Sequence, residues 1–310
     1  MSSAAPPIRR ATVAEIDLDA LAHNVSLLRD RAAPAELWAV VKADGYGHGA
    51  SSVARAALGA GAAGLCVALV QEGLELRAAG IDAPILLLSQ QPADQLAQVV
   101  AADLTSTVDT VAGIEQLGAV ARAANAVHPV HLKIDTGMQR VGAQPAVAVD
   151  LAQRIAGCDS LTLAAAYTHL ACADEPGHPA TATQLARFDA TLADLESAGI
   201  AVPRTHAANS AATLAVPAAR RDLVRCGIAM YGISPGAGVD HLAGDLRPVM
   251  RLASRVSHVK RVEAGSHVSY GWRHRFARAT TVATVPAGYA DGVPRRLGTL
   301  PDRAGAEVLI

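Results

Sequence analysis

From residue 37 to about residue 230, short apolar segments alternate with longer amphipathic ones. Eight of the apolar segments have the length and composition of buried strands. They are residues 37–42, 65–70, 84–89, 104–108, 130–134, 161–168, 202–206 and 223–226. Between them, apolar residues recur at helical spacing, and Gly80 and Gly199 stand where two of these helices would end. Eight strand–helix units predict an α/β fold with parallel strands, whose closed form is a (β/α)8 TIM barrel. An open doubly wound sheet is the alternative, because segment 104–108 is weakly hydrophobic.

The pattern changes after Pro235. Residues 236–245 are rich in glycine, and the segments 250–262 and 280–285 favour strands without a long helix between them. We therefore expect a barrel over residues 13–238 and a mainly β domain over residues 239–310. An N-terminal segment, residues 1–12, is expected to pair with the β domain, and the strand-like stretch 11–17 is the part that would do so. Residues 306–310 resemble an unfinished strand, which suggests an incomplete β domain.

Composition narrows the class of function. The chain has 310 residues, a net charge of −1 and only 3% aromatic residues. A surface for nucleic acid or anionic membranes would need a basic excess, and base stacking would need aromatic rings. The N-terminus lacks the apolar region of a signal peptide, and the longest uncharged stretch, residues 56–70, is too short to cross a bilayer. These features favour a cytoplasmic enzyme that acts on a small molecule.

The common metal and nucleotide motifs are missing from the sequence. It contains no P-loop, no GxGxxG after a strand, no HExxH and no cysteine pair with zinc spacing. Its four cysteines, Cys66, Cys158, Cys172 and Cys226, are expected to be free thiols. Asp174 and Glu175 are more typical of a solvated loop than of a metal site. No metal is therefore expected.

Polar residues collect where the predicted strands end, which is where barrel enzymes carry their active sites. Lys42 closes the first strand before a glycine-rich turn, and burial would make its amine a nucleophile. Taken singly, such residues have structural explanations: a lysine extending to solvent, His169 in the core, Arg225 in a salt bridge, Ser210 as a helix N-cap. Several strands ending this way on one face favour a functional site. Ser210 and the backbone N–H groups of Gly227 and Ile228 could also bind a phosphate.

Seven sequence blocks together resemble the alanine racemase family of pyridoxal-phosphate enzymes. They occur in the family's order over nearly the whole chain. They are AVVKADGYGHG (39–49), HLKIDTGMQRVG (131–142), YTHLACADE (167–175), HAANSAATL (206–214), VRCGIAMYG (224–232), VSYGWRH (268–274) and GYADGVPRRL (288–297). The resemblance implies a barrel that binds pyridoxal 5'-phosphate and a homodimer with shared active sites. The family usually continues well beyond the length of this chain.

The resemblance also implies how the cofactor is held. Lys42 would bind pyridoxal phosphate covalently, and His169 would lie against its ring. Arg225 would meet the pyridine nitrogen. The phosphate would be held by Tyr46, Ser210 and the backbone of Gly227 and Ile228. Asn209 would also belong to the cofactor-binding residues.

For the substrate, the resemblance implies two bases on opposite faces, because racemisation removes a proton from one face of Cα and returns one to the other. Lys42 would serve one face, and Tyr270, from the partner subunit, the other. Arg140 would bind the substrate carboxylate, steadied by Lys133, which is carbamylated in many members. Tyr289 would line the entrance.

The expected reaction is the interconversion of L-alanine and D-alanine, which supplies D-alanine for peptidoglycan. A serine or broad-specificity racemase remains an alternative, because a small apolar pocket rejects a hydroxyl group weakly. A decarboxylase of similar fold is less consistent with Arg225, since such enzymes place an acidic residue against the pyridine nitrogen. A non-catalytic pyridoxal-phosphate carrier would lack the second domain.

Overall fold

The computed structural model describes residues 10–294, which form two compact units. One unit spans Asp17–Val249, and the other combines the N-terminal residues up to Ile16 with those from Met250 onward. The first unit carries the strand–helix alternation predicted from the sequence, and the second is mainly β. Each unit is described separately below.

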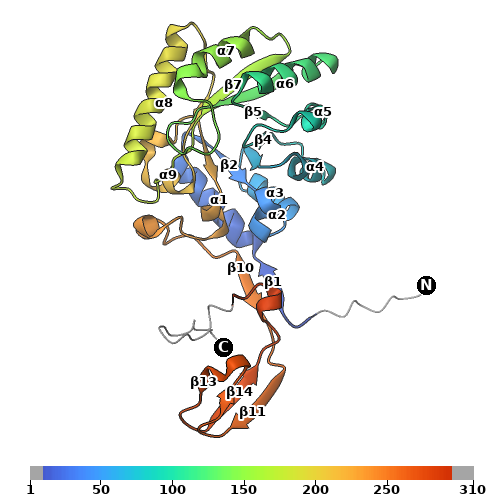
Figure 1. The fold of residues 1–310 in the computed structure, drawn as a ribbon, viewed down its shortest axis with the longest axis vertical. Helices are drawn as coiled ribbons and strands as arrows, with labels where there is room; N and C mark the ends of the chain where they lie inside the picture. The colour runs from blue at the N-terminus through green and yellow to red at the C-terminus, as the bar shows by residue number, and fades with distance from the viewer. Residues whose placement is uncertain (1–9, 295–310) are drawn as a thin grey trace, which may run out of the picture. The chain divides into compact units, whose positions relative to one another are not determined.

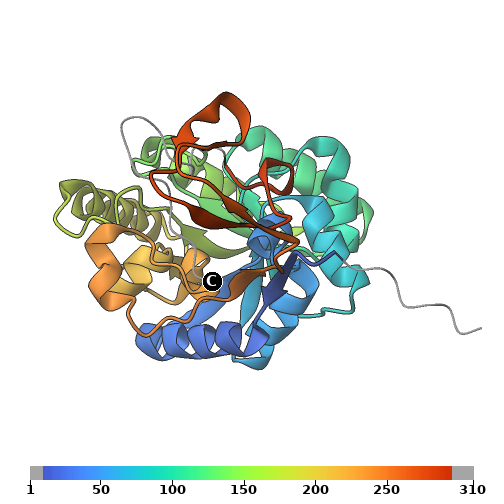
Figure 2. The ribbon, with the colours of Figure 1, turned by 90° about the horizontal axis from the view of Figure 1, so that it is seen from below.

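The first unit is a barrel of eight parallel strands surrounded by helices (Figures 1 and 2). All eight predicted strands are present. They are β2 (Glu36–Val40), β3 (Gly64–Val67), β4 (Ile85–Leu87), β5 (Ser106–Val108), β6 (His128–Lys133), β7 (Leu161–Tyr167), β8 (Thr205–His206) and β9 (Leu223–Cys226). Hydrogen-bonded ladders give two runs, β4-β3-β2-β9 and β5-β6-β7-β8.

Backbone hydrogen bonds join the two runs at both ends. The N–H of Leu87 donates to the carbonyl of Thr105 (3.0 Å), between β4 and β5. The N–H of Arg225 donates to the carbonyl of Ala208 (3.0 Å), between β9 and the segment after β8. The sheet therefore closes, and the open doubly wound alternative is wrong. The weakly hydrophobic segment 104–108 forms only the three-residue strand β5, which explains why the ladder is thin there.

The helices follow the strands in the order that the sequence predicts. They are α1 (Leu18–Ala32), α2 (Lys42–Gly47), α3 (Ala50–Gly59), α4 (Val70–Ala78), α5 (Leu96–Ala101), α6 (Val111–Ala123), α7 (Ala148–Ala156), α8 (Pro179–Ser197) and α9 (Ser210–Ala215). Side-chain caps fix where several of them begin. Asp17 accepts from the N–H of Ala20 (2.9 Å) at α1, and Thr110 accepts from the N–H of Gly113 (3.0 Å) at α6.

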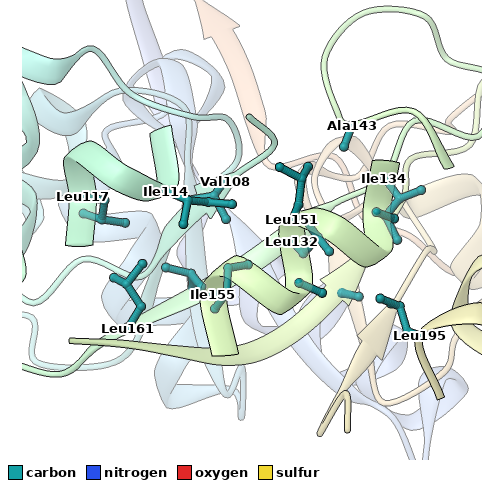
Figure 3. Packing of buried hydrophobic residues seen from close by; sticks show 14 of the residues in the cluster. Val108, Ile114, Leu117, Leu132, Ile134, Ala143, Leu151, Ile155, Leu161 and Leu195 are labelled. Atoms are coloured by element: carbon teal, nitrogen blue, oxygen red, sulfur yellow. The ribbon is translucent and has the colours of Figure 1, made fainter. Parts of the chain in front are cut away.

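One hydrophobic core cluster lies between the strands β5–β7 and the helices α6–α8. Figure 3 shows Leu151 and Ile155 of α7 in the same cluster as Leu132 of β6 and Leu161 of β7. Phe188 of α8 is fully buried in this cluster. Parallel strands covered by helices are buried on both faces, which is why they read as apolar runs rather than as an alternation. This packing fixes the strand ends that carry the polar residues.

The boundaries of the barrel unit differ from the predicted range 13–238. The buried side chain of Asn24 donates to the carbonyls of Met230 (3.1 Å) and Arg247 (2.8 Å) and accepts from the N–H of Arg247 (2.8 Å). These bonds attach the segment 239–249 to α1, so the unit extends to Val249.

The second unit is built from antiparallel pairs. Strand β1 (Val13–Ile16) pairs with β10 (Met250–Ala253), β11 (His258–Val262) with β14 (Thr280–Thr284), and β12 (His267–Val268) with β13 (His274–Arg275). The N-terminal strand β1 lies within the strand-like stretch 11–17 and belongs to the β unit. Within residues 1–12, Arg10 forms an ion pair with Asp291. The predicted strand at 306–310 lies outside the described residues.

We predict that Asn24→Ala destabilises the chain by about 2 to 4 kcal/mol, because it leaves the buried carbonyl of Met230 and the part-buried N–H and carbonyl of Arg247 without these bonds. Urea unfolding of the full chain measures this loss. Gln98→Ala, which removes an exposed amide from α5, is the matched control and should cost less than about 0.5 kcal/mol. Equal effects of the two substitutions would contradict the role given to Asn24.

Candidate functional site

A cavity of about 520 Å³ opens where the barrel strands end, and it is built entirely from the barrel unit. All the barrel residues that the sequence singled out line it. These are Lys42, Tyr46, Lys133, Arg140, His169, Asn209, Ser210, Arg225, Gly227 and Ile228. Asp174 lines it as well, so the loop that the sequence suggested was merely solvated contributes to the wall.

Lys42 stands at the start of an unusual turn rather than at the end of its strand. Strand β2 ends at Val40, and Lys42 is the first residue of α2. The next four residues, Ala43–Tyr46, have left-handed backbone angles, with φ between 52° and 60°. This conformation costs roughly 1–2 kcal/mol for each residue other than glycine, and only Gly45 is free of that cost. The turn therefore depends on contacts from outside itself.

Tyr46, at the other end of this turn, faces the segment after β9. A Cβ atom on Gly227 would lie 2.6 Å from the Tyr46 hydroxyl oxygen, so glycine is needed for the two to approach. Burial raises the pKa of Tyr46, which keeps the hydroxyl protonated and able to donate.

Ser210 lies beside the same segment. Its hydroxyl oxygen accepts from the N–H of Gly227 (2.9 Å) and from that of Ala229 (3.3 Å). The helix N-cap suggested for Ser210 belongs instead to Asn209, whose side chain accepts from the N–H of Ala212 (3.0 Å). Tyr46 and Ser210 therefore converge with a bend of main chain at one end of the cavity.

Arg225 is enclosed in the barrel wall without an acidic partner. Its guanidinium donates to the carbonyls of Thr168 (2.9 Å) and Ala207 (3.3 Å) and to the Nδ1 atoms of His206 and His169 (3.3 Å to the latter). The salt bridge considered for Arg225 is not found among the ion pairs of residues 10–294. The cavity thus contains a buried positive charge that is solvated only by neutral groups.

Two buried histidines continue from Arg225 into the barrel. Because a guanidinium can only donate, His206 must accept at Nδ1 and carry its proton on Nε2. That Nε2 lies 3.1 Å from Nδ1 of His131, which must accept in turn. Burial, reinforced by nearby arginines, lowers the pKa of His131 to about 3 and that of His206 well below its usual range. Both imidazoles are therefore neutral, with their tautomers set by Arg225.

His169 and Lys133 lie in the same positive environment. Burial first, and then Arg225, lowers the pKa of His169 to about 3. Burial, followed by Arg225 and Arg140, lowers the pKa of Lys133 to about 8. The Lys133 amine donates to the carbonyl of Leu88 (2.9 Å). A lysine with such a pKa has a substantial neutral fraction near neutral pH and can react as a nucleophile.

Sequence reasoning gave no role to Tyr167, His131 or His206. The ring of Tyr167 is stacked on that of His206, with 4.4 Å between centroids, and its hydroxyl donates to the carbonyl of Leu88 (2.9 Å). A period-two signal was available in β6, where His131 and Lys133 are both buried polar residues two positions apart.

The two remaining predicted site residues belong to the β unit. Tyr270 is 81% exposed and Tyr289 is 66% exposed, each in a short 3₁₀ helix (Tyr270–Trp272 and Tyr289–Asp291). Their roles stay predictions.

The cysteine prediction is confirmed. All four cysteines are free, and burial raises the pKa of Cys66 and of Cys226 to about 12, so neither is a reactive thiolate. Over residues 10–294, no helix combines the length and apolar character that a membrane span requires.

Comparisons with known proteins agree with the cavity's composition. A family model described as "Alanine racemase, N-terminal domain" matches residues 16–235, and one described as "Alanine racemase, C-terminal domain" matches residues 249–310. The chain is 47% identical to a curated alanine racemase of Thermobifida fusca over 285 residues, which cover 91% of this chain and 76% of that protein. It is 45% identical to one of Symbiobacterium thermophilum, again covering 76% of it.

Solved structures give the same result. The structure of alanine racemase from Streptomyces coelicolor superimposes with a TM-score of 0.88 at 44% identity, covering 93% of this chain and 77% of that one. The racemase from Streptomyces lavendulae gives a TM-score of 0.87 at 42% identity, covering 94% and 77%. With both family domains matched in order over nearly all of its length, this chain belongs to the alanine racemase family.

Proposed function

We propose that this chain interconverts L-alanine and D-alanine with pyridoxal 5'-phosphate bound in the barrel cavity. The observation that carries the proposal is a reachable lysine, Lys42, in the same cavity as the buried, uncompensated charge of Arg225. When bound, the cofactor makes the Cα–H bond of an attached amino acid acidic enough to break. The chain's own residues supply binding, orientation and proton transfer.

The cavity suits an anionic, ring-shaped ligand. Its lining contains four basic side chains, Lys42, Lys133, Arg140 and Arg225. A phosphate group would fit the end where Tyr46 and Ser210 converge, because both hydroxyl groups can donate to its oxygens there, while the Ser210 oxygen is held by the N–H of Gly227. Lys42, at the other end of the turn that carries Tyr46, would bond to the aldehyde carbon.

Arg225 would face the nitrogen of the cofactor ring. A guanidinium is a donor that remains charged, so it can hydrogen-bond to an unprotonated ring nitrogen but does not give up its proton. By leaving that nitrogen unprotonated, Arg225 would weaken the electron withdrawal that the cofactor supplies and so limit side reactions such as transamination. His206 and His131 support this role, because as neutral acceptors they leave the charge on Arg225.

Proton transfer would use two groups. The Lys42 amine would remove or return the proton on one face of the substrate Cα. The Tyr270 hydroxyl, from the partner subunit of a homodimer, exchanges it on the other. Arg140 would bind the substrate carboxylate, with Lys133 behind it, and Tyr289 would line the entrance. A cytoplasmic location and the supply of D-alanine for peptidoglycan complete the proposal.

The lowered pKa of Lys133 supports its carbamylation. Carbon dioxide reacts only with a neutral amine, and a pKa of about 8 leaves much more of that form near neutral pH than an ordinary lysine has. A carbamate would replace a positive charge by a negative one and so pair with the neighbouring Arg140.

We predict that the purified chain, supplied with pyridoxal phosphate, converts L-alanine to D-alanine, and that Lys42→Ala lowers this activity at least about 1,000-fold, since it removes both the cofactor anchor and one base. Chiral chromatography of alanine, with L-serine as a parallel substrate, measures it.

In deuterated water, Tyr270→Phe should slow exchange from one enantiomer far more than from the other. Equal slowing of both would contradict the two-base assignment, and cofactor binding without any turnover would favour a carrier.

We also predict that Lys133→Met stabilises the cofactor-free chain more at pH 7 than at pH 10. Below about pH 8 the native state must bury a charged lysine, and that penalty disappears as pH rises toward the ordinary value near 10.4. The gain should therefore shrink by up to about 3 kcal/mol over this range. Urea unfolding in carbon-dioxide-free buffer measures it, with Lys260→Met on the exposed face of β11 as control. If the gain in unfolding free energy did not depend on pH, burial would not penalise the charged form of Lys133.

A further inference from the structure

Glu72, in the first turn of α4, binds the backbone of two different loops with one carboxylate. Its Oε2 accepts from the N–H groups of Ala68 (2.8 Å) and Leu69 (3.0 Å), in the loop between β3 and α4. Its Oε1 accepts from the N–H of Ala43 (2.5 Å), in the turn that follows β2. Both oxygens are therefore used, and the second one joins α4 to a segment 29 residues earlier in the chain.

Ala43 is the residue directly after Lys42 and the first of the four left-handed residues. The backbone of this turn is bonded internally from the N–H of Gly45 to the carbonyl of Val41 (2.8 Å), and Asp44 accepts from the N–H of Ala50 (2.8 Å). The N–H of Ala43 takes no part in these bonds and donates to Glu72 instead. Glu72 therefore restrains the turn at the point where it leaves Lys42.

Helix α4, which carries Glu72, is held in place by close packing. The adjacent Gly73 is buried, and a Cβ there would lie 2.7 Å from Leu104, so α4 packs closely against the chain before β5. Ala68, which Glu72 also holds, lines the cavity. A shift of this carboxylate would therefore displace Lys42, Tyr46 and the cavity wall together.

We infer that Glu72 is a positioning residue for Lys42 and Tyr46: it locks the left-handed turn so that the amine and the hydroxyl face the cavity at a fixed separation. The inference rests on the proposed function, since it assigns Lys42 to the cofactor. Because the energetic cost of the turn falls on three residues other than glycine, an external restraint of this kind is required.

Glu72→Gln tests this inference with the smallest change of shape. An amide has one accepting oxygen and one donating nitrogen, so it cannot accept from Ala43 and from the Ala68–Leu69 pair at once. Glu72→Asp keeps the carboxylate in the first turn of α4 but shortens its reach to Ala43. Glu75→Gln is the matched control, because Glu75 is exposed on the same helix and its side chain bonds only Gln71 among the described residues.

Three measurements on the full chain separate positioning from mere stabilisation. Hydrogen exchange of the Ala43 amide, without cofactor, should be at least about 10-fold faster in Glu72→Gln and Glu72→Asp than in wild type. With cofactor, kcat for alanine should fall about 10- to 100-fold in both variants while KM changes less than about threefold, because the reacting amine is misplaced. Trapping of pyridoxal phosphate on Lys42 by borohydride, followed by mass spectrometry, should slow in parallel.

Unchanged Ala43 exchange, or a wild-type kcat in the folded Glu72→Gln variant, would overturn the inference. So would loss of thermal stability with kcat and KM both unaltered, which is the signature of a purely structural cap. Failure of the wild type to racemise alanine would refute the proposed function instead. In that case, the exchange and trapping rates of the variants still decide whether Glu72 positions Lys42.

Discussion

The guanidinium of Arg225 sits in a barrel wall where every group that it contacts is neutral. An isolated buried charge is costly, and proteins usually pair it with an acid. Here carbonyls and imidazoles solvate the charge without cancelling it. The charge acts on its neighbours. After burial, Arg225 is the next largest cause that lowers the pKa values of His169 and Lys133, and it sets the tautomers of His206 and His131. The cavity is thereby prepared for an anionic ligand.

The barrel makes this arrangement possible because its strands end together at one face. Parallel strands place Lys42, Lys133, His169 and Arg225 around one opening although they are far apart in the chain. The strands are rigid, yet Lys42 is carried by a strained turn rather than by a strand. Glu72 supplies the restraint that the turn lacks, from a helix that packs against the barrel. The strain of the left-handed turn is thus offset by the packing of helix α4 beside it.

Much of the fold could be predicted from the sequence, because buried parallel strands leave apolar runs that stand out against helical periodicity. The strand ends could be predicted for the same reason, and with them the barrel residues that line the cavity. What could not be predicted depends on contacts between distant segments. Asn24 sets the unit boundary through Met230 and Arg247, some 200 residues away. Neither a pattern of hydrophobicity nor a turn motif records such bonds.

The same limit applies inside the site. The direction of hydrogen bonding from Arg225 through His206 to His131 depends on three strands, β9, β8 and β6, that only the closed barrel brings together. The left-handed turn after Val41 could not be predicted either, since only one of its four residues is a glycine. Asn209 took the cap that sequence reasoning suggested for Ser210, which leaves the serine hydroxyl beside Gly227. The roles of Tyr270 and Tyr289 stay predictions.

Under the proposed function, Arg225 keeps its proton and would leave the nitrogen of a bound pyridoxal-phosphate ring unprotonated. Nitrogen NMR of the chain loaded with ¹⁵N-labelled pyridoxal phosphate reports the protonation state of that nitrogen directly. We expect the chemical shift of an unprotonated, hydrogen-bonded pyridine nitrogen throughout the neutral pH range. The shift of a protonated pyridinium in the wild-type site would contradict this expectation.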